Sequence, residues 1–361
     1  MSTSKEQRLP ALDLLRGVAA FAVMLPHYFM YSTNGTWPLA ESFSITAVEV
    51  FFVLSGFVLG PQIMLCAKVR NWETLKTFWM RRWMRTIPSY LVALLFISVI
   101  FKRIGSSDFV RYATYVQNFF SQHNVSDYYP VAWSLSVEEW YYVAFPAFLL
   151  LCGLFFKNRD GYVAATLLFI ALVTASRIFF GDMIEWGPHV RRVVIFRVDA
   201  IAYGFLLYLI VQRASNSRII FSRWITVLLI MTTVLVVSIN MQMLSGNEVL
   251  LEHAFPFASA AFGSSAILAF LSFNDLLRPR WLYGACIYLG RISYPVYLFH
   301  LVVLYLLVAW GLVHGLSGMF LYLAVVVLCA TAFFYGFEQP ILSARPHYKS
   351  STTKLMSSPV S

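Results

Sequence analysis

Residues 11–27 read ALDLLRGVAAFAVMLPH. The segment is apolar enough for a transmembrane helix, yet it carries Asp13, Arg16 and His27. Ionisable side chains are costly in hydrocarbon unless they face a protein interior or water, so each of the three is a candidate functional residue. Arg16 and His27 are separated by about three helical turns, which places them on one side of the helix and about 16 Å apart along its axis. One helix therefore offers an acid and a guanidinium near one end and an imidazole near the other.

The composition of the whole chain is that of a membrane protein. Of its 361 residues, 59% are hydrophobic and only 12% are charged, and the mean hydropathy is +0.69. A soluble domain carries about twice that share of charged residues. The net charge of +10 would suggest a nucleic-acid partner in a soluble protein. In a membrane protein it is explained by basic loops on one side of the bilayer, so we expect no nucleic-acid partner.

Apolar stretches of roughly 20 residues, enough to cross about 30 Å of hydrocarbon, recur along the chain. We expect an all-α polytopic membrane protein with about ten transmembrane helices, near residues 11–31, 43–66, 86–105, 131–156, 161–181, 193–212, 219–240, 254–273, 284–309 and 317–340. The third is placed near residue 86 because Pro88 is tolerated in a first helical turn.

Lys and Arg are concentrated in alternate loops of this arrangement, on the side of the N-terminus. The positive-inside rule then predicts that both termini are cytoplasmic, and the expected location is the plasma membrane, which is the inner membrane in a bacterium. We expect residues 1–342 to form one integral membrane domain and residues 343–361, rich in Ser and Lys, to form a short disordered cytoplasmic tail. The four cysteines lie in or beside apolar segments without ligand spacing, so no metal site is expected.

An arginine-rich stretch, residues 76–90, reads KTFWMRRWMRTIPSY. Arg82 and Arg85 are three apart and share a face if the stretch is helical. One interpretation is a cytoplasmic basic cluster beside an aromatic belt. The other is an anion site, because guanidinium forks match phosphate geometry and bind it through paired hydrogen bonds.

Two acidic residues stand together in the predicted fourth span, where residues 131–146 read VAWSLSVEEWYYVAFP. Ser134 and Glu138 are four apart and share a helix face. A carboxylate that holds one ring nitrogen of a histidine fixes the tautomer and raises the basicity of the other nitrogen. Glu138 is therefore our candidate partner for an imidazole, and a structural ion pair is the alternative.

Three further ionisable residues lie in apolar segments, namely Glu49, Arg197 and His300. Glu49 either pairs with Arg16 or another span or has a direct functional role. Arg197 pairs with other spans, with Asp13 or with Glu49, or contributes to function. A lone histidine such as His300 on an apolar helix is more often a core residue with satisfied hydrogen bonds than a catalyst. The outer segment, about residues 106–130, carries tyrosines that either stack on sugar rings or form an interfacial aromatic belt, namely Tyr112, Tyr115, Tyr128 and Tyr129.

Seven motifs, taken in order over about residues 9–340, resemble those of acyltransferase family 3. They are LDLLRGVAAFAVMLPHY, FFVLSGFVL, FWMRRWMRTIPSY, AWSLSVEEWYYVAFP, FRVDAIAYG, ISYPVYLFH and FEQP. Members of this family are membrane O-acyltransferases that modify cell-envelope or exported glycans, commonly with acetyl groups from acetyl-CoA. The resemblance implies the same reaction class, the same donor and a glycan or glycolipid acceptor for this chain.

The family's short signatures fall on residues already singled out by their chemistry. Its Arg-x10-His signature matches Arg16 and His27, its Arg-x-x-Arg signature matches Arg82 and Arg85, and its Ser-x-x-x-Glu signature matches Ser134 and Glu138. The family often has Asp where Glu49 stands here.

These residues suggest a division of roles for acyl transfer. An acceptor hydroxyl must lose a proton, and His27 is the expected general base, oriented by Glu138. Arg82 and Arg85 are expected to hold the phosphates of coenzyme A, and Arg16 either to hold the donor or to stabilise charge on the thioester carbonyl. The expected supporting residues are Asp13, Glu49, Ser134, Arg197 and His300. Whether His27 acts as a base or is itself acylated is left open by the sequence.

The alternative function is a transporter or flippase for a lipid-linked or small-molecule substrate. The intramembrane residues Asp13, Arg16, Glu49 and His27 would then form an ion or proton relay. The lack of visible internal repeats counts against this alternative, because many transporters are built from two repeated halves.

Overall fold

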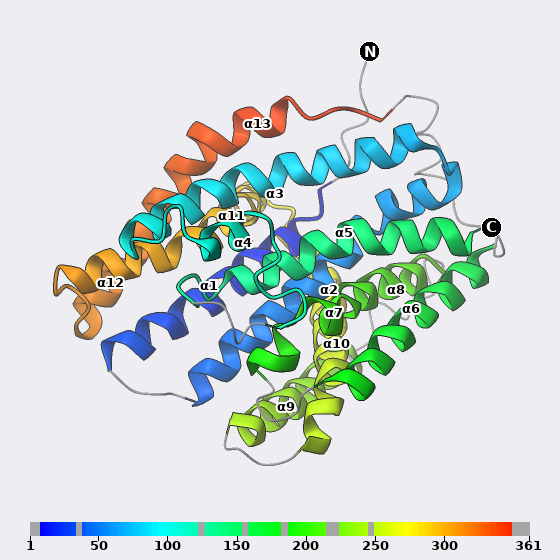
Figure 1. The fold of residues 1–361 in the computed structure, drawn as a ribbon, viewed down its shortest axis with the longest axis horizontal. Helices are drawn as coiled ribbons and strands as arrows, with labels where there is room; N and C mark the ends of the chain where they lie inside the picture. Colours follow the sequence, from blue (N-terminus) through cyan, green and yellow to red (C-terminus); the bar gives the residue numbers. More distant parts are fainter. Residues whose placement is uncertain are drawn as a thin grey trace.

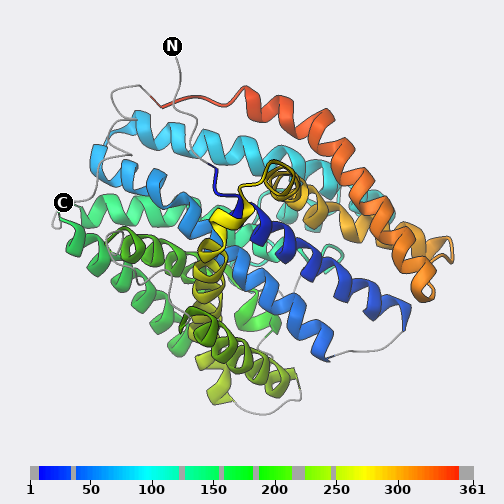
Figure 2. The same ribbon diagram turned by 180° about the vertical axis from the view of Figure 1, so that it is seen from behind.

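The computed structural model describes residues 8–33, 38–121, 127–153, 158–181, 187–213, 224–244 and 249–348, and these ranges contain helices and no strand. Figures 1 and 2 show the helices gathered into one bundle. The α-helices are α1 (Pro10–Ser32), α2 (Pro38–Val69), α3 (Trp72–Ile100), α4 (Ser107–Ala113), α5 (Ala132–Cys152), α6 (Arg159–Phe180), α7 (Val194–Arg197), α8 (Asp199–Arg213), α9 (Trp224–Leu244), α10 (Val249–Ser272), α11 (Arg280–Ala309), α12 (Gly315–Phe333) and α13 (Gln339–Ser343). Three short turns of other helical type complete the set, η1 (Gly187–Arg191), η3 (Asn274–Leu277) and η4 (Phe334–Glu338).

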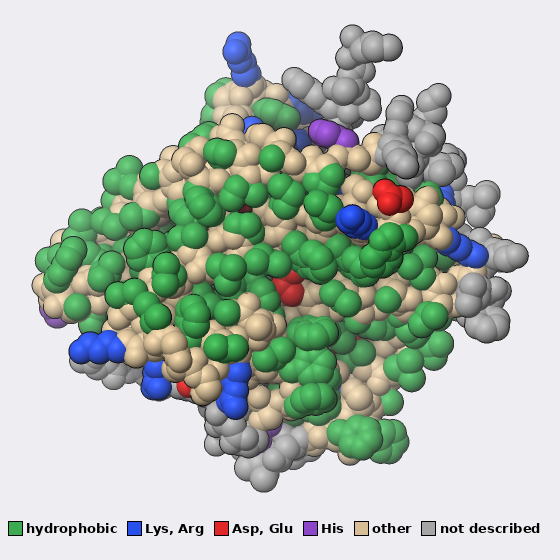
Figure 3. Space-filling view, turned by 45° about the horizontal axis from the view of Figure 1, so that its top comes forward, with side chains coloured by type: hydrophobic (Ala, Val, Ile, Leu, Met, Phe, Trp, Pro, Cys, Tyr) green, Lys and Arg blue, Asp and Glu red, His purple; other side chains and the backbone are tan. Residues whose placement is uncertain are grey.

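Within the described ranges, ten helical segments are long and apolar enough to cross a membrane. This finding confirms the predicted class and the predicted number of spans, while the sidedness of the termini stays a prediction. Two of the ten are composite, since α7 continues into α8 and α12 continues through η4 into α13. Figure 3 shows a face covered largely by hydrophobic side chains, with most of the Lys and Arg in view near its edges, as expected for a surface that meets lipid.

The third span begins earlier than the sequence suggested. Its helix α3 starts at Trp72, because the side chain of Asn71 caps it by accepting a hydrogen bond of 2.8 Å from the backbone N–H of Thr74. Pro88 lies inside this helix and not in its first turn. The arginine-rich stretch is therefore helical. The prediction that the third span begins near residue 86, after a loop, is wrong.

Helix α2 is the centre of the bundle and packs against α1, α3, α5, α8, α9 and α10. Its closest approach is to α8, where two glycines permit contact between backbones. A Cβ atom at Gly56 would overlap the carbonyl oxygen of Ile201, and a Cβ at Gly204 would overlap the carbonyl oxygen of Val53. Small residues at such crossings let membrane helices pack closely, and this contact fixes α7 and α8 against α2.

The tyrosines of the predicted outer segment lie inside the protein. Tyr112, Tyr115, Tyr128 and Tyr129 are between 0% and 7% exposed. Ring centroids lie 4.8 Å apart for Tyr112 and Tyr128 and 4.6 Å apart for Tyr115 and Tyr90 of α3. Their faces pack on one another, so neither sugar stacking nor an interfacial belt describes them.

The predicted C-terminal tail begins in a described part of the chain. Both ribbon views show the segment after α13 running beside α3 (Figures 1 and 2). The structure describes this segment as far as Tyr348, and the rest of the predicted tail, residues 349–361, lies outside the described residues.

Replacing Gly204 by alanine tests the close crossing of α2 and α8. We expect Gly204→Ala to lower the midpoint of thermal unfolding in detergent, since overpacking costs roughly 1–3 kcal/mol. Gly284→Ala in α11 is the matched control, because no atom lies within 4 Å of its Cβ position. Equal midpoints for the two variants would contradict the proposed backbone contact.

Candidate active site

A cavity of about 720 Å³ is lined by residues of α1, α2, α3, α5, α8 and α11, with further residues from α10, η3 and the segment after α13. Its volume is in the range of roughly 300–1,000 Å³ that holds small-molecule ligands and cofactors. The charged residues of its wall are Arg8, Asp13, Arg16, Arg81, Arg82, Arg85, Glu138, Asp275 and Arg345. The wall therefore carries more positive than negative groups, which favours an anionic ligand.

Three of the predicted donor-binding residues meet in this cavity. Arg82 and Arg85 enter it from α3 and Arg16 from α1. Arg82 donates a hydrogen bond of 3.0 Å to the side-chain oxygen of Gln62, a neutral partner. In the part of the chain that the structure describes, none of the cavity arginines forms an ion pair with a carboxylate. Guanidinium groups left in this state are ready to bind phosphate, which supports the anion-site interpretation.

Ser134 and Glu138 line the same cavity from one face of α5, as their spacing predicted. Glu138 accepts hydrogen bonds from the Ser55 hydroxyl, at 2.8 Å, and from the Tyr142 hydroxyl. Ser134 shares a hydrogen bond of 2.5 Å with the hydroxyl of Tyr297 on α11. Ser134 is thus held by Tyr297, and Glu138 is held by Tyr142. All four side chains line the cavity.

The predicted pairing of Glu138 with His27 is not formed. Nδ1 of His27 lies 2.7 Å from the carbonyl oxygen of Val23, one turn earlier on α1. A carbonyl oxygen only accepts, so Nδ1 carries the proton and Nε2 is left as the basic nitrogen. The backbone of α1 therefore fixes the tautomer that the sequence analysis assigned to Glu138.

A second imidazole accompanies His27. The ring centroids of His27 and His300 lie 5.1 Å apart. Nδ1 of His300 lies 2.8 Å from the carbonyl oxygen of Tyr297, so it too carries the proton. Nε2 of His300 is fully buried and has no hydrogen-bond partner among the described residues.

Neither histidine lines the cavity, but Tyr297 links the two regions. It lines the cavity wall, and its ring centroid lies 6.1 Å from that of His300. His300 is thus a neighbour of both Tyr297 and His27, and of these three residues only Tyr297 lines the cavity. Arg16 and His27 lie on the single helix α1, as predicted, with only the Arg16 end open to the cavity.

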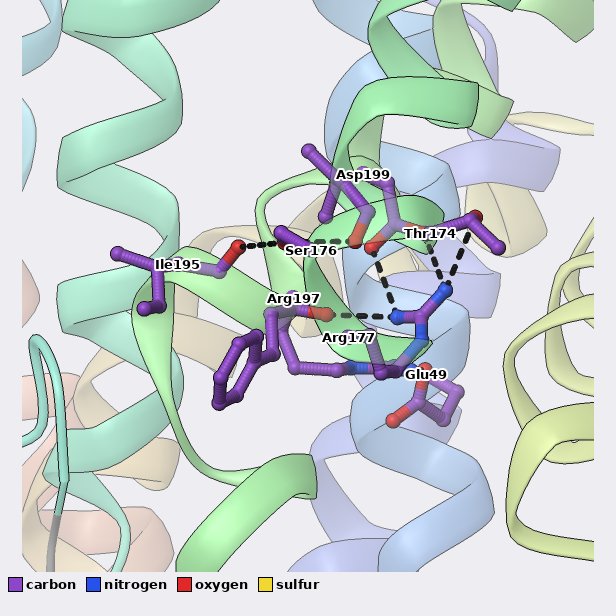
Figure 4. Close-up of polar contacts among 9 residues, drawn as sticks. Glu49, Thr174, Ser176, Arg177, Ile195, Arg197 and Asp199 are labelled. Carbon is purple, nitrogen blue, oxygen red and sulfur yellow. Dashed lines mark hydrogen bonds and ion pairs between the residues drawn. The ribbon is translucent and has the colours of Figure 1, made fainter. Parts of the chain in front are cut away.

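Glu49 and Arg197 lie apart from the cavity and pair with one another, one of the alternatives left open by the sequence. Beside them, Arg177 forms an ion pair of 3.0 Å with Asp199 and donates a hydrogen bond of 2.6 Å to the carbonyl oxygen of Phe196. All four charged side chains are at most 2% exposed. Figure 4 shows that this network joins α2, α6, α7 and α8, which indicates a structural role.

Asp13 also lines the cavity and packs against Gly290 of α11, where a Cβ atom would overlap its carboxylate. The sequence analysis did not identify Tyr142 and Tyr297 as site residues. Tyr297 precedes His300 by three residues, so it lies on the same helix face, and that spacing was the available signal.

Comparison with known proteins identifies the family of the chain. The acyltransferase domain of family 3 matches residues 9–337, nearly the whole chain. The chain belongs to acyltransferase family 3. The resemblance drawn from its motifs is thereby confirmed.

One relative of this family 3 acyltransferase is named an O-acetyltransferase, and another is named an acyltransferase. It is 30% identical to the peptidoglycan O-acetyltransferase OatA of Listeria monocytogenes over 203 residues, which is 48% of this chain and 31% of that protein. It is 32% identical to the acyltransferase MdmB of Streptomyces mycarofaciens over 155 residues, 38% of each chain. The match thus spans less than half the length of these relatives. No solved structure matches the chain.

Breaking the Glu49–Arg197 pair tests its structural role. We expect Glu49→Gln to lower the free energy of unfolding by about 3–5 kcal/mol, because it leaves a buried guanidinium without its counter-charge. The double variant Glu49→Gln with Arg197→Met is expected to be more stable than Glu49→Gln alone. The readout is the midpoint of thermal unfolding in detergent.

Asp160→Asn is the control for this series, since the ion pair of Asp160 with Arg213 is 75% exposed on both sides. A surface pair contributes little, so its loss is expected to leave the midpoint unchanged. A shift for Asp160→Asn as large as that for Glu49→Gln would contradict the assigned role of the buried network.

Proposed function

We propose that this acyltransferase moves an acyl group, with acetyl as the first choice, from acyl-CoA to a hydroxyl of an exported glycan or glycolipid. The observation that carries the proposal is a cavity lined both by arginines that form no ion pair among the described residues and by Tyr297, which lies next to His300 and through it near His27. The family and its relatives support the O-acyltransferase class. The peptidoglycan named in one relative supports a glycan as the acceptor class.

The arginine end of the cavity fits the nucleotide part of the donor. Coenzyme A carries a diphosphate, and Arg82 and Arg85 supply two guanidinium forks from one face of α3. Arg16 joins them, so of its two predicted roles we assign it donor binding. From Arg16 to His27 the rise of the helix is about 16 Å, comparable to an extended pantetheine arm. The arm then runs along α1 and carries the thioester toward Tyr297 and the histidines.

The histidine end fits the chemical step. Nε2 of His27 accepts the proton of the acceptor hydroxyl while the oxygen forms a bond to the thioester carbonyl carbon. The carbon–sulfur bond then breaks, and the thiolate of coenzyme A takes the proton from the imidazolium. We assign the hydroxyls of Ser134 and Tyr297 the stabilisation of negative charge on the carbonyl oxygen, in exchange for the hydrogen bonds that they form with one another and with the carbonyl oxygen of Val131.

The two ends of the protein suggest opposite routes for the two substrates. If the positive-inside rule holds, the arginine end faces the cytoplasm, where acyl-CoA is made, and His27 lies toward the outer face. The donor enters from inside, and the acceptor approaches from outside. No metal ion is needed for this scheme, because the base and the charge-stabilising groups are all side chains.

A transfer assay tests the proposed function. Purified protein in detergent is given radiolabelled acetyl-CoA and a crude envelope-glycan extract, and base-labile label in the glycan is counted. We expect His27→Gln to lower transfer by at least 100-fold, within the range of about 10²–10⁴ that a general base contributes. His314→Gln, which changes an exposed histidine at the start of α12, is the matched control and is expected to retain transfer.

Transfer by the wild type in detergent would also exclude the transporter alternative, since no vectorial transport is possible there. Full transfer by His27→Gln would remove His27 from the chemical step. Trapping of an acyl group on His27 in the wild type would replace the general-base role by that of an acyl carrier.

A further inference from the structure

The chain after α13 forms a strap at the arginine end of the cavity. This C-terminal strap comprises residues 344–348 and lies beside α3. Arg81 donates a hydrogen bond of 2.8 Å to the carbonyl oxygen of Pro346, and its guanidinium carbon lies 5.4 Å from the ring centroid of Tyr348. Arg81 therefore holds the strap, and its guanidinium is less available to a ligand than those of the other cavity arginines.

The strap also reaches the donor-binding arginines. The Tyr348 hydroxyl lies 3.5 Å from the side-chain oxygen of Gln62, the same oxygen that accepts the hydrogen bond from Arg82. Arg81 therefore holds the strap directly, and Gln62 of α2 links it to Arg82. Only Ala344 and Arg345 lie between the end of α13 and the attached Pro346, so the position of Arg345 is held from both ends.

Arg345 is aimed into the cavity from the strap. Its Nε donates a hydrogen bond of 3.0 Å to the carbonyl oxygen of Leu342, and the residue lines the cavity wall. Its two terminal nitrogens have no hydrogen-bond acceptor among the residues that the structure describes. The fork of this guanidinium is therefore available to a ligand.

Most of the charged groups around Arg345 are positive, and the carboxylate of Glu338 is the exception. Burial, together with the positive charges of Arg85, Arg81 and Arg82, lowers the pKa of Arg345 to about 10. At neutral pH the group is still a cation, so several like charges remain close together in a partly buried site. A multivalent anion that lies between them would remove this repulsion.

We propose that Arg345 binds the phosphomonoester on the ribose of the donor, apart from the diphosphate held by Arg82 and Arg85. The inference rests on the proposed acyl-CoA donor and names the part of it that the strap recognises. A phosphomonoester carries about −1.5 to −2 charge at neutral pH and three acceptor oxygens, which suits a free guanidinium fork. Acyl phosphates and acyl carrier proteins lack a phosphomonoester on a ribose. The strap therefore selects for thioesters of coenzyme A that carry the 3′-phosphate.

The test compares two donors that differ only in this group, acetyl-CoA and acetyl-3′-dephospho-CoA. We expect the wild type to show a kcat/KM at least 10-fold higher for acetyl-CoA. Arg345→Gln is expected to lower kcat/KM for acetyl-CoA to the level of the dephospho donor and to leave the value for the dephospho donor unchanged. Arg345→Lys is expected to restore part of the preference, because it keeps the charge but not the fork.

Arg213→Gln is the matched control, since Arg213 is an exposed arginine outside the cavity. It is expected to keep the full preference for acetyl-CoA. Equal use of the two donors by the wild type, or an equal loss for both donors in Arg345→Gln, would overturn the role of Arg345 and leave acyl-CoA as the donor. Failure of the wild type to use either thioester would overturn the proposed donor itself, and the role of Arg345 with it.

Discussion

Charge inside a bundle of membrane-spanning helices is the constraint on which this structure depends. An isolated ion in a medium of low dielectric constant costs several kcal/mol, so each charged group needs a counter-charge or access to water. The protein meets this requirement in two ways. Glu49 with Arg197, and Arg177 with Asp199, form ion pairs in the interior. The arginines of α1 and α3 instead face a cavity, and their charge is left for a ligand to neutralise.

The two solutions divide the bundle into a rigid part and a binding part. The paired charges join α2, α6, α7 and α8, and the glycine crossing of α2 with α8 locks the same helices together. Helix α2 also forms a wall of the cavity, through Ser55 and Gln62. The interior ion pairs therefore hold one wall in place, while the walls from α1, α3 and α11 present the arginines and Tyr297, and the histidines lie behind Tyr297. A site preorganised in this way spends little binding energy on ordering its own groups.

The sequence predicted the features that depend on local patterns. The length of the apolar stretches predicted the ten spans. Helical periodicity placed Arg16 and His27 on one helix, and Ser134 and Glu138 on one helix face. The start of α3 was missed because Trp72 begins a helix that is first polar and basic, and Pro88 offered a stronger signal of a helix start than Asn71. The partner of His27 was missed for a different reason. A carboxylate on another span was an attractive partner, yet the ring instead contacts the carbonyl oxygen of Val23, one turn earlier on its own helix.

Contacts between distant spans were beyond the sequence pattern altogether. The Glu138–Tyr142 hydrogen bond lies within one helix, but the pairing of Ser134 with Tyr297 joins residues 163 positions apart. No periodicity in either segment specifies that neighbour. The same holds for the strap, whose attachment to Arg81 joins positions 265 apart. Such contacts depend on how the helices pack, and they supply much of the chemistry proposed for the site.

The central claim is that the cavity holds the donor with its nucleotide at the arginines and its acyl end toward the histidines. The most direct measurement is a cryo-electron microscopy structure of the protein with a non-hydrolysable acetyl-CoA analogue in which a methylene group replaces the thioester sulfur. The account predicts diphosphate density within hydrogen-bond distance of Arg82 and Arg85 and the acetyl end beside Tyr297 and His27. Density for the nucleotide at the histidine end, or binding outside a cavity that stays empty, would contradict it.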